Sequence, residues 1–400
     1  MRAGRRVASG GRIGLVCPST DGRWLGGLYY LQHLVLAVAE LPPEERIGFV
    51  DVWWNEAPKH DPFSEIREHL GPRVVVGLPH RLVPRIARAV RRRALGAQPG
   101  MSDLFESNGI GVLFPSLPCK EPGLPYVCWL ADLQHRHLAK YYTPEQLEAI
   151  EATVIEESSK AALVMLSSNA AMQDLEKYYP HLVPKARVVF PVSVPTAEWF
   201  ACDPAEVATR LGLPDRFLMV SNQICAHKNH AVILEAVQRL NGEGTRVTVV
   251  CTGLRQDYRD PAFFSSLQAR VDAMGLAGQV LFVGALPRAE QLALMRRAIG
   301  VAQPSEFEGW GSAMSDAKVL GRPILASNLP VHREHGADVR AYLEPHDVEA
   351  WSREIRSLWL HGSLGPDVEA EARALESARG ERLRVGRETV AFFGEAIAHR

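Results

Sequence analysis

Two hydrophobic patterns alternate along almost the whole chain. Short apolar runs, typical of strands buried on both faces, are followed by segments in which apolar residues recur at helical spacing. The predicted strands of the first half include IGLVCP, IGFVDVWW, RVVVGL, GIGVLF, YVCWL and ALVML, and those of the second half include FLMVS, RVTVVCTG, QVLFVG, GVAQPS and PILAS. The helical segments between them include residues 169–178 and 230–240. Continuous apolar strands joined by helices predict parallel sheets whose two faces are covered.

The pattern restarts once, near residues 191–204. This segment, PVSVPTAEWFACDP, is rich in proline and has no period, as expected of a linker. A chain of 400 residues also suits two α/β domains better than one. We therefore expect two Rossmann-like domains, at residues 1–195 and 196–382, whose parallel sheets face each other across a cleft. Residues 366–400 are predicted to be helical, with a final helix, within residues 383–400, that crosses back to the first domain.

Composition and charge narrow the class of protein. The formal net charge is −1, which does not fit a protein that coats nucleic acid. The six cysteines show neither CxxC nor metal-ligand spacing, so we interpret them as reduced thiols. The basic start precedes an apolar run too short for a signal peptide, and no run reaches the ~20 residues of a membrane span. We expect a cytoplasmic protein with no metal, no cofactor and no nucleic-acid partner.

The segment PSEFEGWGSAMSDAKVLGRPILASNLP carries the clearest signal of chemistry. A predicted strand ends just before it, and a predicted helix begins at Ser312. Free N–H groups at a helix start favour an anion, and the two loop glycines allow a phosphate to approach the backbone. Glu308 lies in the loop and Asp316 lies one turn into the helix, so both carboxylates can face one ligand. The alternative is purely structural: Glu308 and Ser312 cap the helix, and Asp316 complements its dipole.

The spacing Glu-x7-Asp in this setting resembles the Glu-x7-Glu signature of retaining family 4 glycosyltransferases of the GT-B fold. The resemblance spans residues 11–359 and is strongest over 217–335. It implies that Glu308 lies against the donor sugar and that Asp316 accepts the ribose hydroxyls of the nucleotide. Aspartate is one methylene shorter than the glutamate of the family. The other donor-binding residues that the resemblance implies in this loop are Gly309, Trp310, Gly311 and Ser312.

A second segment, FLMVSNQICAHKNHAVILEA, resembles the phosphate loop of the same family. The family's lysine contacts the donor diphosphate, and Lys228 is its match. Many members carry an arginine where this chain has Asn222 and Gln223, and we assign Asn222 to the donor site as well. A lysine beside a helix start is disfavoured by the helix dipole unless an anion is bound, which agrees with a phosphate site.

The first domain adds two weaker signals. Gly27 follows Gly26 before a predicted helix, and the family uses such a pair for close approach to the donor phosphates. The segment WLADLQHRHLAKYY resembles the region that carries the family's sugar-facing histidine. Ala131 stands at that position, and we assign the catalytic role to His135 instead. The alternative is that His135 and His137 are plain surface residues.

The resemblance implies a retaining, metal-independent glycosyltransferase. Its donor would be a nucleoside-diphosphate sugar, GDP-mannose or a UDP-hexose, and its acceptor a glycan or glycolipid of envelope polysaccharide synthesis. The chain contains no Asp-x-Asp motif of the metal-clamped kind. Three alternatives stay open: a non-catalytic nucleotide-sugar-binding protein, a sugar-nucleotide epimerase and a phosphorylase.

A basic amphipathic stretch, LVPRIARAVRRRALG, is predicted to dock on the inner face of an anionic membrane or on a phosphorylated lipid acceptor. A solvated helix face is the alternative. The arginines concerned are Arg85, Arg88, Arg91, Arg92 and Arg93.

Overall fold

The computed structural model describes residues 11–16, 25–54, 61–76, 101–115, 123–257 and 259–399. The first domain contains seven strands in these ranges. They are β1 (Arg12–Val16), β2 (Phe49–Trp54), β3 (Leu70–Val76), β4 (Ile110–Phe114), β5 (Val127–Leu130), β6 (Leu163–Leu166) and β7 (Ala186–Val188). Their order is β3-β2-β1-β4 in one sheet and β5-β6-β7 in another, and every pairing is parallel. A parallel bridge between Leu113 and Tyr126 links the two sheets.

The second domain is a six-stranded parallel sheet in the order β10-β9-β8-β11-β12-β13. Its strands are β8 (Leu218–Ser221), β9 (Val249–Thr252), β10 (Val280–Gly284), β11 (Val301–Gln303), β12 (Ile324–Ser327) and β13 (Ala341–Leu343). In chain order this is 3-2-1-4-5-6, the dinucleotide-binding arrangement, with the order reversing between β8 and β11. Ligands of such sheets bind at that reversal, beside the carboxyl ends of the strands. The predicted α/β class with two Rossmann-like domains is confirmed.

The α-helices of the first domain are α1 (Leu25–Ala39), α3 (Met101–Ser107), α4 (Gln134–His137), α5 (Pro144–Lys160) and α6 (Asn169–Tyr178). Those of the second are α7 (Pro204–Arg210), α8 (His230–Gly242), α9 (Phe263–Ala273), α10 (Arg288–Arg297), α11 (Ser312–Val319), α12 (Pro330–Arg333), α13 (Val348–His361) and α14 (Val368–Ala398). Local signals fix several boundaries: α6 begins where the Ser168 side chain accepts the N–H of Ala171, as an N-cap does. None of the helices in the described ranges is long and apolar enough to cross a lipid bilayer.

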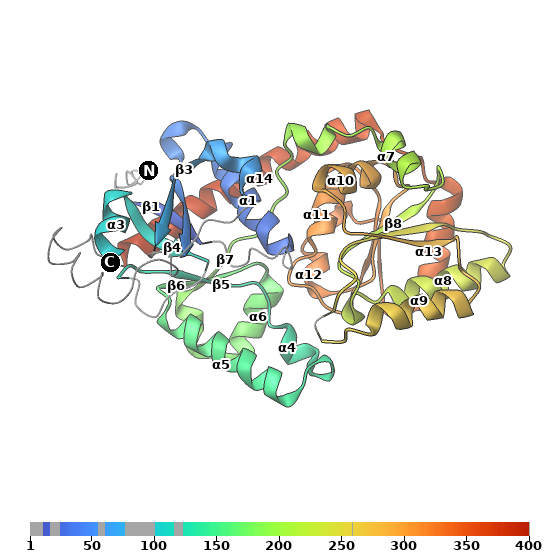
Figure 1. Ribbon diagram of the computed structural model, residues 1–400, viewed down its shortest axis with the longest axis horizontal. Helices are drawn as coiled ribbons and strands as arrows, with labels where there is room; N and C mark the ends of the chain where they lie inside the picture. The colour runs from blue at the N-terminus through green and yellow to red at the C-terminus, as the bar shows by residue number, and fades with distance from the viewer. Residues whose placement is uncertain are drawn as a thin grey trace, which may run out of the picture.

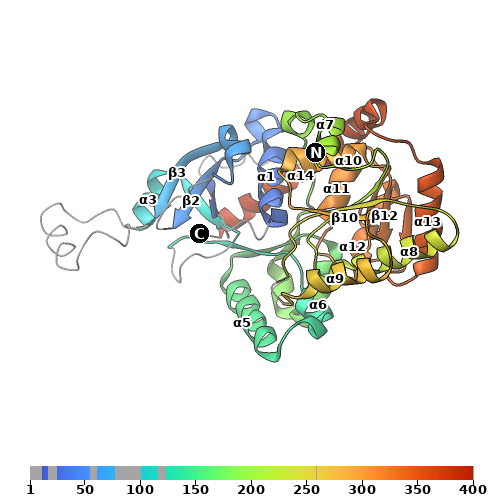
Figure 2. The same cartoon turned by 45° about the vertical axis from the view of Figure 1, so that its right-hand side comes forward.

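The long final helix joins the two domains (Figures 1 and 2). Near its start, Glu371 forms a buried ion pair with Arg296 of α10, 2.8 Å from Nε to Oε1. Further along it packs on α1, where a side chain at Gly386 would meet the carbonyl oxygen of Ala37 at 2.4 Å. Phe393 is fully buried in the core of the first domain. The sequence predicted a helical tail over residues 366–400 with a separate crossing helix from residue 383, whereas α14 is one helix from Val368.

Candidate functional site

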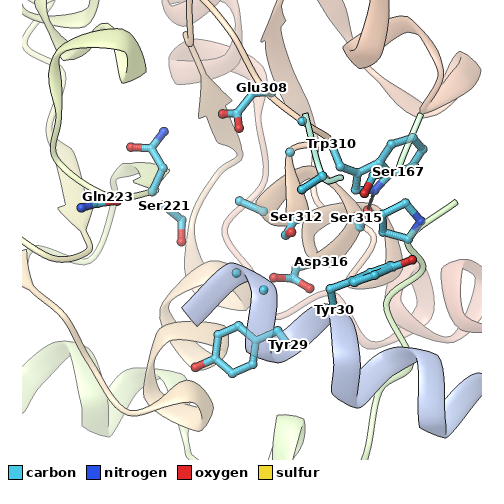
Figure 3. A pocket seen from close by; sticks show the side chains of 18 of the residues that line it. Tyr29, Tyr30, Ser167, Ser221, Gln223, Glu308, Trp310, Ser312, Ser315 and Asp316 are labelled. Atoms are coloured by element: carbon cyan, nitrogen blue, oxygen red, sulfur yellow. Dashed lines mark hydrogen bonds between the residues drawn. The ribbon is translucent and has the colours of Figure 1, made fainter. Parts of the chain in front are cut away.

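A cavity of about 480 Å³ lies between the two domains (Figure 3). It is lined by residues at or just after the carboxyl ends of strands in both domains, among them Asp132, Ser167, Ser221 and Gln303. This is the position that the topology predicts for a ligand, and the volume is typical of a site for a small molecule.

Lys228 and Glu308 meet inside this cavity. Lys228 ends a 3₁₀ turn before α8, and its Nζ donates to Oε2 of Glu308 at 2.6 Å. The two side chains are only 15% and 7% exposed. Oε1 of Glu308 accepts from the hydroxyl of Ser305 at 2.6 Å. Burial alone would raise the pKa of Glu308, but Lys228, His332 and these hydrogen bonds outweigh it and hold the pKa at about 2. Glu308 is therefore a buried anion at neutral pH.

The loop that carries Lys228 is fixed by its neighbour. Asn229 has φ 52° and ψ 42°, and it is the one non-glycine residue with a positive φ in the part of the chain that the structure describes. Asparagine tolerates this left-handed conformation better than most residues. Its Nδ2 donates to the carbonyl oxygens of Pro304, at 3.0 Å, and Pro345, at 2.7 Å. These bonds tie the lysine loop to the loop that carries Glu308.

The start of α11 is open toward the cavity. Its N-cap is Gly311, with φ 97°, and no side chain caps it. The structural alternative, in which Glu308 and Ser312 cap this helix, is thus not what the structure shows. Position 309 requires a glycine because a Cβ there would meet Oδ2 of Asp132 at 2.8 Å. The side chain of Trp310 is buried, and its Nε1 donates to the hydroxyl of Ser315 at 2.8 Å.

Asp316 is buried beside the same helix start. Its Oδ1 accepts from the hydroxyl of Ser193, in the linker, at 2.7 Å, and its Oδ2 lies 2.8 Å from Nη2 of Arg288. The guanidinium of Arg288 lies over the rings of Tyr29, at 4.5 Å, and Trp199, at 4.9 Å. Arg288 also lines the cavity, and it is not among the site residues predicted from the sequence. Arg288 belongs to no recognisable motif. The one signal for it in the sequence is its position at a helix start that follows a predicted strand.

His135 does not line the cavity, so the structure does not bring it together with the other residues assigned to the site. Its Nε2 lies 3.2 Å from Oε2 of Glu151 and 3.4 Å from the hydroxyl of Tyr179, and its side chain is buried. The one-turn helix α4 directs Gln134 toward the cavity and turns His135 toward α5 instead. His135 is also not the surface residue of the alternative interpretation.

Asp132 lines the cavity on the first-domain side. Burial raises its pKa, and its Oδ1 accepts the N–H of Gln134 at 2.9 Å. The other residues assigned from the sequence all line the same cavity: Gly27, Asn222, Lys228, Glu308, Gly309, Trp310, Gly311, Ser312 and Asp316. The basic stretch Arg85–Arg93 lies outside the described residues.

Several contacts close the cleft from one domain to the other. Glu334, after α12, accepts the N–H of Asn169 through Oε2 and that of Ala170 through Oε1, both at 2.8 Å. Oε2 of Glu306 accepts from Nζ of Lys140 at 2.9 Å. Across the described ranges, no group of three His, Cys, Asp or Glu side chains is arranged to hold a metal ion.

Comparisons with known proteins find similarity to glycosyltransferases in sequence and in fold. Residues 207–375 match the model of the family described as glycosyl transferases group 1. D-inositol 3-phosphate glycosyltransferase of Mycobacterium sp. (strain JLS) is 26% identical over 276 residues, which cover 67% of this chain and 60% of that relative. O-antigen chain mannosyltransferase RfbU of Salmonella typhimurium is 27% identical over 133 residues, 33% of this chain and 35% of that relative.

Among solved structures, Anabaena Alr3699/HepE in complex with UDP and glucose is similar to the whole chain. The TM-score is 0.62 at 14% identity, and the match covers 95% of this chain and 98% of that one. The two-domain architecture is therefore the GT-B fold, and residues 207–375 are similar to the glycosyl transferases of group 1.

Proposed function

We propose that this chain is a glycosyltransferase that moves a hexosyl group from a nucleoside-diphosphate sugar to a glycan or glycolipid acceptor. The observation that carries the proposal is the buried Lys228–Glu308 pair beside the uncapped start of α11. A cation, free N–H groups and an anion within one cavity match the two charges of the reaction. The cation and the N–H groups match the negative charge of the departing diphosphate, and the anion matches the positive charge that develops at the anomeric carbon.

The proposed donor lies across the start of α11. The diphosphate binds at the N–H groups of Gly311 and Ser312 and beside the ammonium group of Lys228. Lys228 also stabilises the negative charge that develops on the diphosphate as it leaves. The ribose hydroxyls donate to Asp316. The sugar lies against Glu308, whose carboxylate is ionised at neutral pH and stabilises the positive charge that develops at the anomeric carbon.

Two mechanistic details belong to the same proposal. Transfer proceeds on the face that the diphosphate leaves, so the anomeric configuration is retained. It requires no metal, because Lys228 and the helix start supply the positive field at the diphosphate.

The donor is proposed to be a UDP-hexose or GDP-mannose. The Anabaena structure holds UDP and glucose, and the Salmonella relative is named as a mannosyltransferase of the O-antigen chain. That second name also supports an acceptor from envelope polysaccharide synthesis. A membrane contact through Arg85–Arg93 stays a prediction.

The test is turnover of UDP-glucose, UDP-galactose and GDP-mannose in excess EDTA, with an alkyl hexoside or water as acceptor. We expect release of the nucleoside diphosphate from at least one donor, with a product of unchanged anomeric configuration by NMR. Interconversion of sugar nucleotides without release would indicate an epimerase. Binding without turnover would indicate a binding protein, and activity restored only by Mg²⁺ or Mn²⁺ would contradict the metal-independent mechanism.

A further inference from the structure

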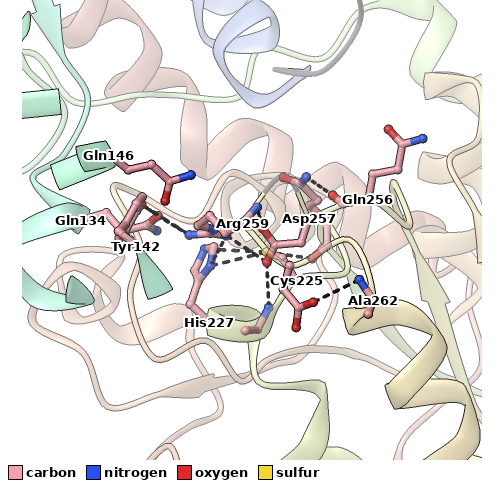
Figure 4. A network of polar contacts seen from close by, with 12 residues as sticks. Gln134, Tyr142, Gln146, Cys225, His227, Gln256, Asp257, Arg259 and Ala262 are labelled. Atoms are coloured by element: carbon pink, nitrogen blue, oxygen red, sulfur yellow. Dashed lines mark hydrogen bonds and ion pairs between the residues drawn. The ribbon is translucent and has the colours of Figure 1, made fainter. Parts of the chain in front are cut away.

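A third cationic side chain, Arg259, lines the cavity together with Lys228 and Arg288. It lies within a network of polar contacts (Figure 4). It follows β9, and its side chain is only 5% exposed. Its Nε and Nη2 donate to the two carboxylate oxygens of Asp257, at 2.9 and 3.4 Å. The carboxylate of Asp257 also accepts the N–H of Ala226, at 3.3 Å, at the start of the lysine loop. The Asp257–Arg259 pair therefore holds the start of the lysine loop through the hydrogen bond from Ala226.

The remaining donors of Arg259 reach two other places. Nη2 lies 3.0 Å from Nδ1 of His227, the residue before Lys228. Nη1 donates across the cleft to Oε1 of Gln134, at 2.8 Å, and to the hydroxyl of Tyr142, at 3.4 Å. A guanidinium has five N–H groups, and these contacts engage all three of its nitrogens. A phosphate could bind Arg259 only by displacing one of these partners, so its geometry is that of a positioning residue.

The contact with His227 determines where that ring carries its proton. Arginine has no acceptor, so Nδ1 of His227 must be the acceptor. Burial, and then the charge of Lys228, hold the pKa of His227 well below its ordinary value, so the ring is neutral. Its single proton is therefore on Nε2. His227 lines the cavity, and the partner of its Nε2 within the described residues is Sγ of Cys225, at 4.0 Å, so this weak contact leaves a neutral N–H donor next to the lysine.

The side chain of Arg259 thus connects the lysine loop to the first domain. The carbonyl oxygen of His227 accepts the N–H of Glu306 at 2.7 Å, which links the lysine loop to the loop of Glu308. The ring of the same histidine is held by Arg259, and Arg259 is held by Gln134 and Tyr142 of the other domain.

We propose that Arg259 positions the phosphate-binding loop. It keeps the proton of His227 on Nε2, as a donor to an anion in the cavity, and it makes the geometry of the loop depend on contact with the first domain. The inference rests on the proposed function, because it assigns the loop to a diphosphate. It also explains how a chain with Asn222 and Gln223 at the family's arginine position orders this loop.

The test compares Arg259→Gln with Arg255→Gln. Arg255 lies on the same segment, outside the cavity, and its substitution removes the same charge. Calorimetric titrations use UDP and GDP, with uridine and guanosine as the matched nucleosides. We expect Arg259→Gln to lose about tenfold or more in affinity for the diphosphate, with nucleoside affinity unchanged, and Arg255→Gln to bind as wild type. Gln134→Ala, which leaves the Asp257–Arg259 pair in place, should show a smaller loss of the same kind.

A second readout is the tautomer of His227 in ¹⁵N-histidine NMR spectra, assigned from the signal that His227→Gln removes. We expect the Nε2–H form in wild type and a mixture of forms in Arg259→Gln. The Nδ1–H form in wild type, equal loss for nucleoside and diphosphate, or unchanged binding by Arg259→Gln would overturn the inference. If wild type binds none of these nucleotides, the proposed function fails, while the tautomer still decides the role of Arg259.

Discussion

Nζ of Lys228 lies 2.6 Å from Oε2 of Glu308, so the two residues proposed to hold the diphosphate and the sugar form an ion pair with each other. They come from the loops after β8 and β11, neighbouring strands at the point where the strand order reverses. From the sequence, the position of Lys228 near a helix start predicts a bound anion. The structure supplies that anion from within the chain, and a donor would share the lysine with Glu308.

Lys228→Ala should therefore weaken both binding and folding. Affinity for UDP or GDP should fall by about 2–4 kcal/mol, the range for losing one partner of a largely buried charge pair, while affinity for the nucleoside is kept. The free energy of unfolding should fall by about 3 kcal/mol, since Glu308 is left buried without its cation. Adding Glu308→Gln should recover part of that stability but none of the affinity. Urea unfolding and calorimetry measure the two effects, and full stability in the single variant would contradict the pair's role.

Asp316→Ala should weaken nucleoside and nucleoside diphosphate binding by the same factor. We expect about tenfold or more, the range for a hydrogen bond to a charged group, because the ribose is common to both ligands. Ser193→Ala is the control, since it removes a partner of Asp316 and keeps the carboxylate. A loss confined to the diphosphate would place Asp316 at the phosphates, and no loss for either ligand would remove it from the donor site.

The acid stability of the chain should depend on Glu308. Its pKa is about 2 in the folded chain against an ordinary value of 4.5, so the folded state takes up this proton only at lower pH than the unfolded state does. The stabilisation is fully present above about pH 4.5 and is lost as the pH falls toward 2. Between pH 5 and pH 3, wild type should lose more unfolding free energy than Glu308→Gln does. Parallel curves for the two proteins, measured by urea unfolding, would show that Glu308 is not ionised in the fold.

Glu334 should hold the cleft closed in the absence of ligand. Its carboxylate accepts two N–H groups at the start of α6, where a negative charge is favoured by the helix dipole. Glu334→Ala should increase the radius of gyration in small-angle X-ray scattering, and added nucleotide should reverse the change. Glu344→Ala is the control, because Glu344 contacts Asn328 within the second domain only. Identical scattering from wild type and Glu334→Ala would contradict this role.

The strands and helices that follow a periodic apolar pattern were predictable from the sequence. Fully buried strands such as β8 and β12 are apolar up to their final serine, and α6 spans residues 169–178 as its period predicted. Nine residues assigned by motif line one cavity, because loops at the same ends of parallel strands converge.

Contacts between distant segments carry no such pattern. Arg288 becomes part of the site only through its pairing with Asp316 and two aromatic rings, which no local spacing encodes. His135 lies in a single helical turn, too short for a period to show which way each side chain points. The tail was predicted to be helical, but the continuity of α14 from residue 368 was not, because its first half is rich in charge and has few apolar positions.

Glu308→Gln tests the central claim most directly. The change keeps the size of the side chain and removes the charge that faces the sugar, so kcat should fall by about 100-fold or more with donor affinity within about threefold of wild type. Glu306→Gln is the matched control, the same change in the same loop at a residue that pairs with Lys140 outside the cavity. It should keep most of the turnover. If Glu308→Gln retained a kcat within about threefold of wild type, less than 1 kcal/mol of transition-state stabilisation, this cavity would not be the site of glycosyl transfer.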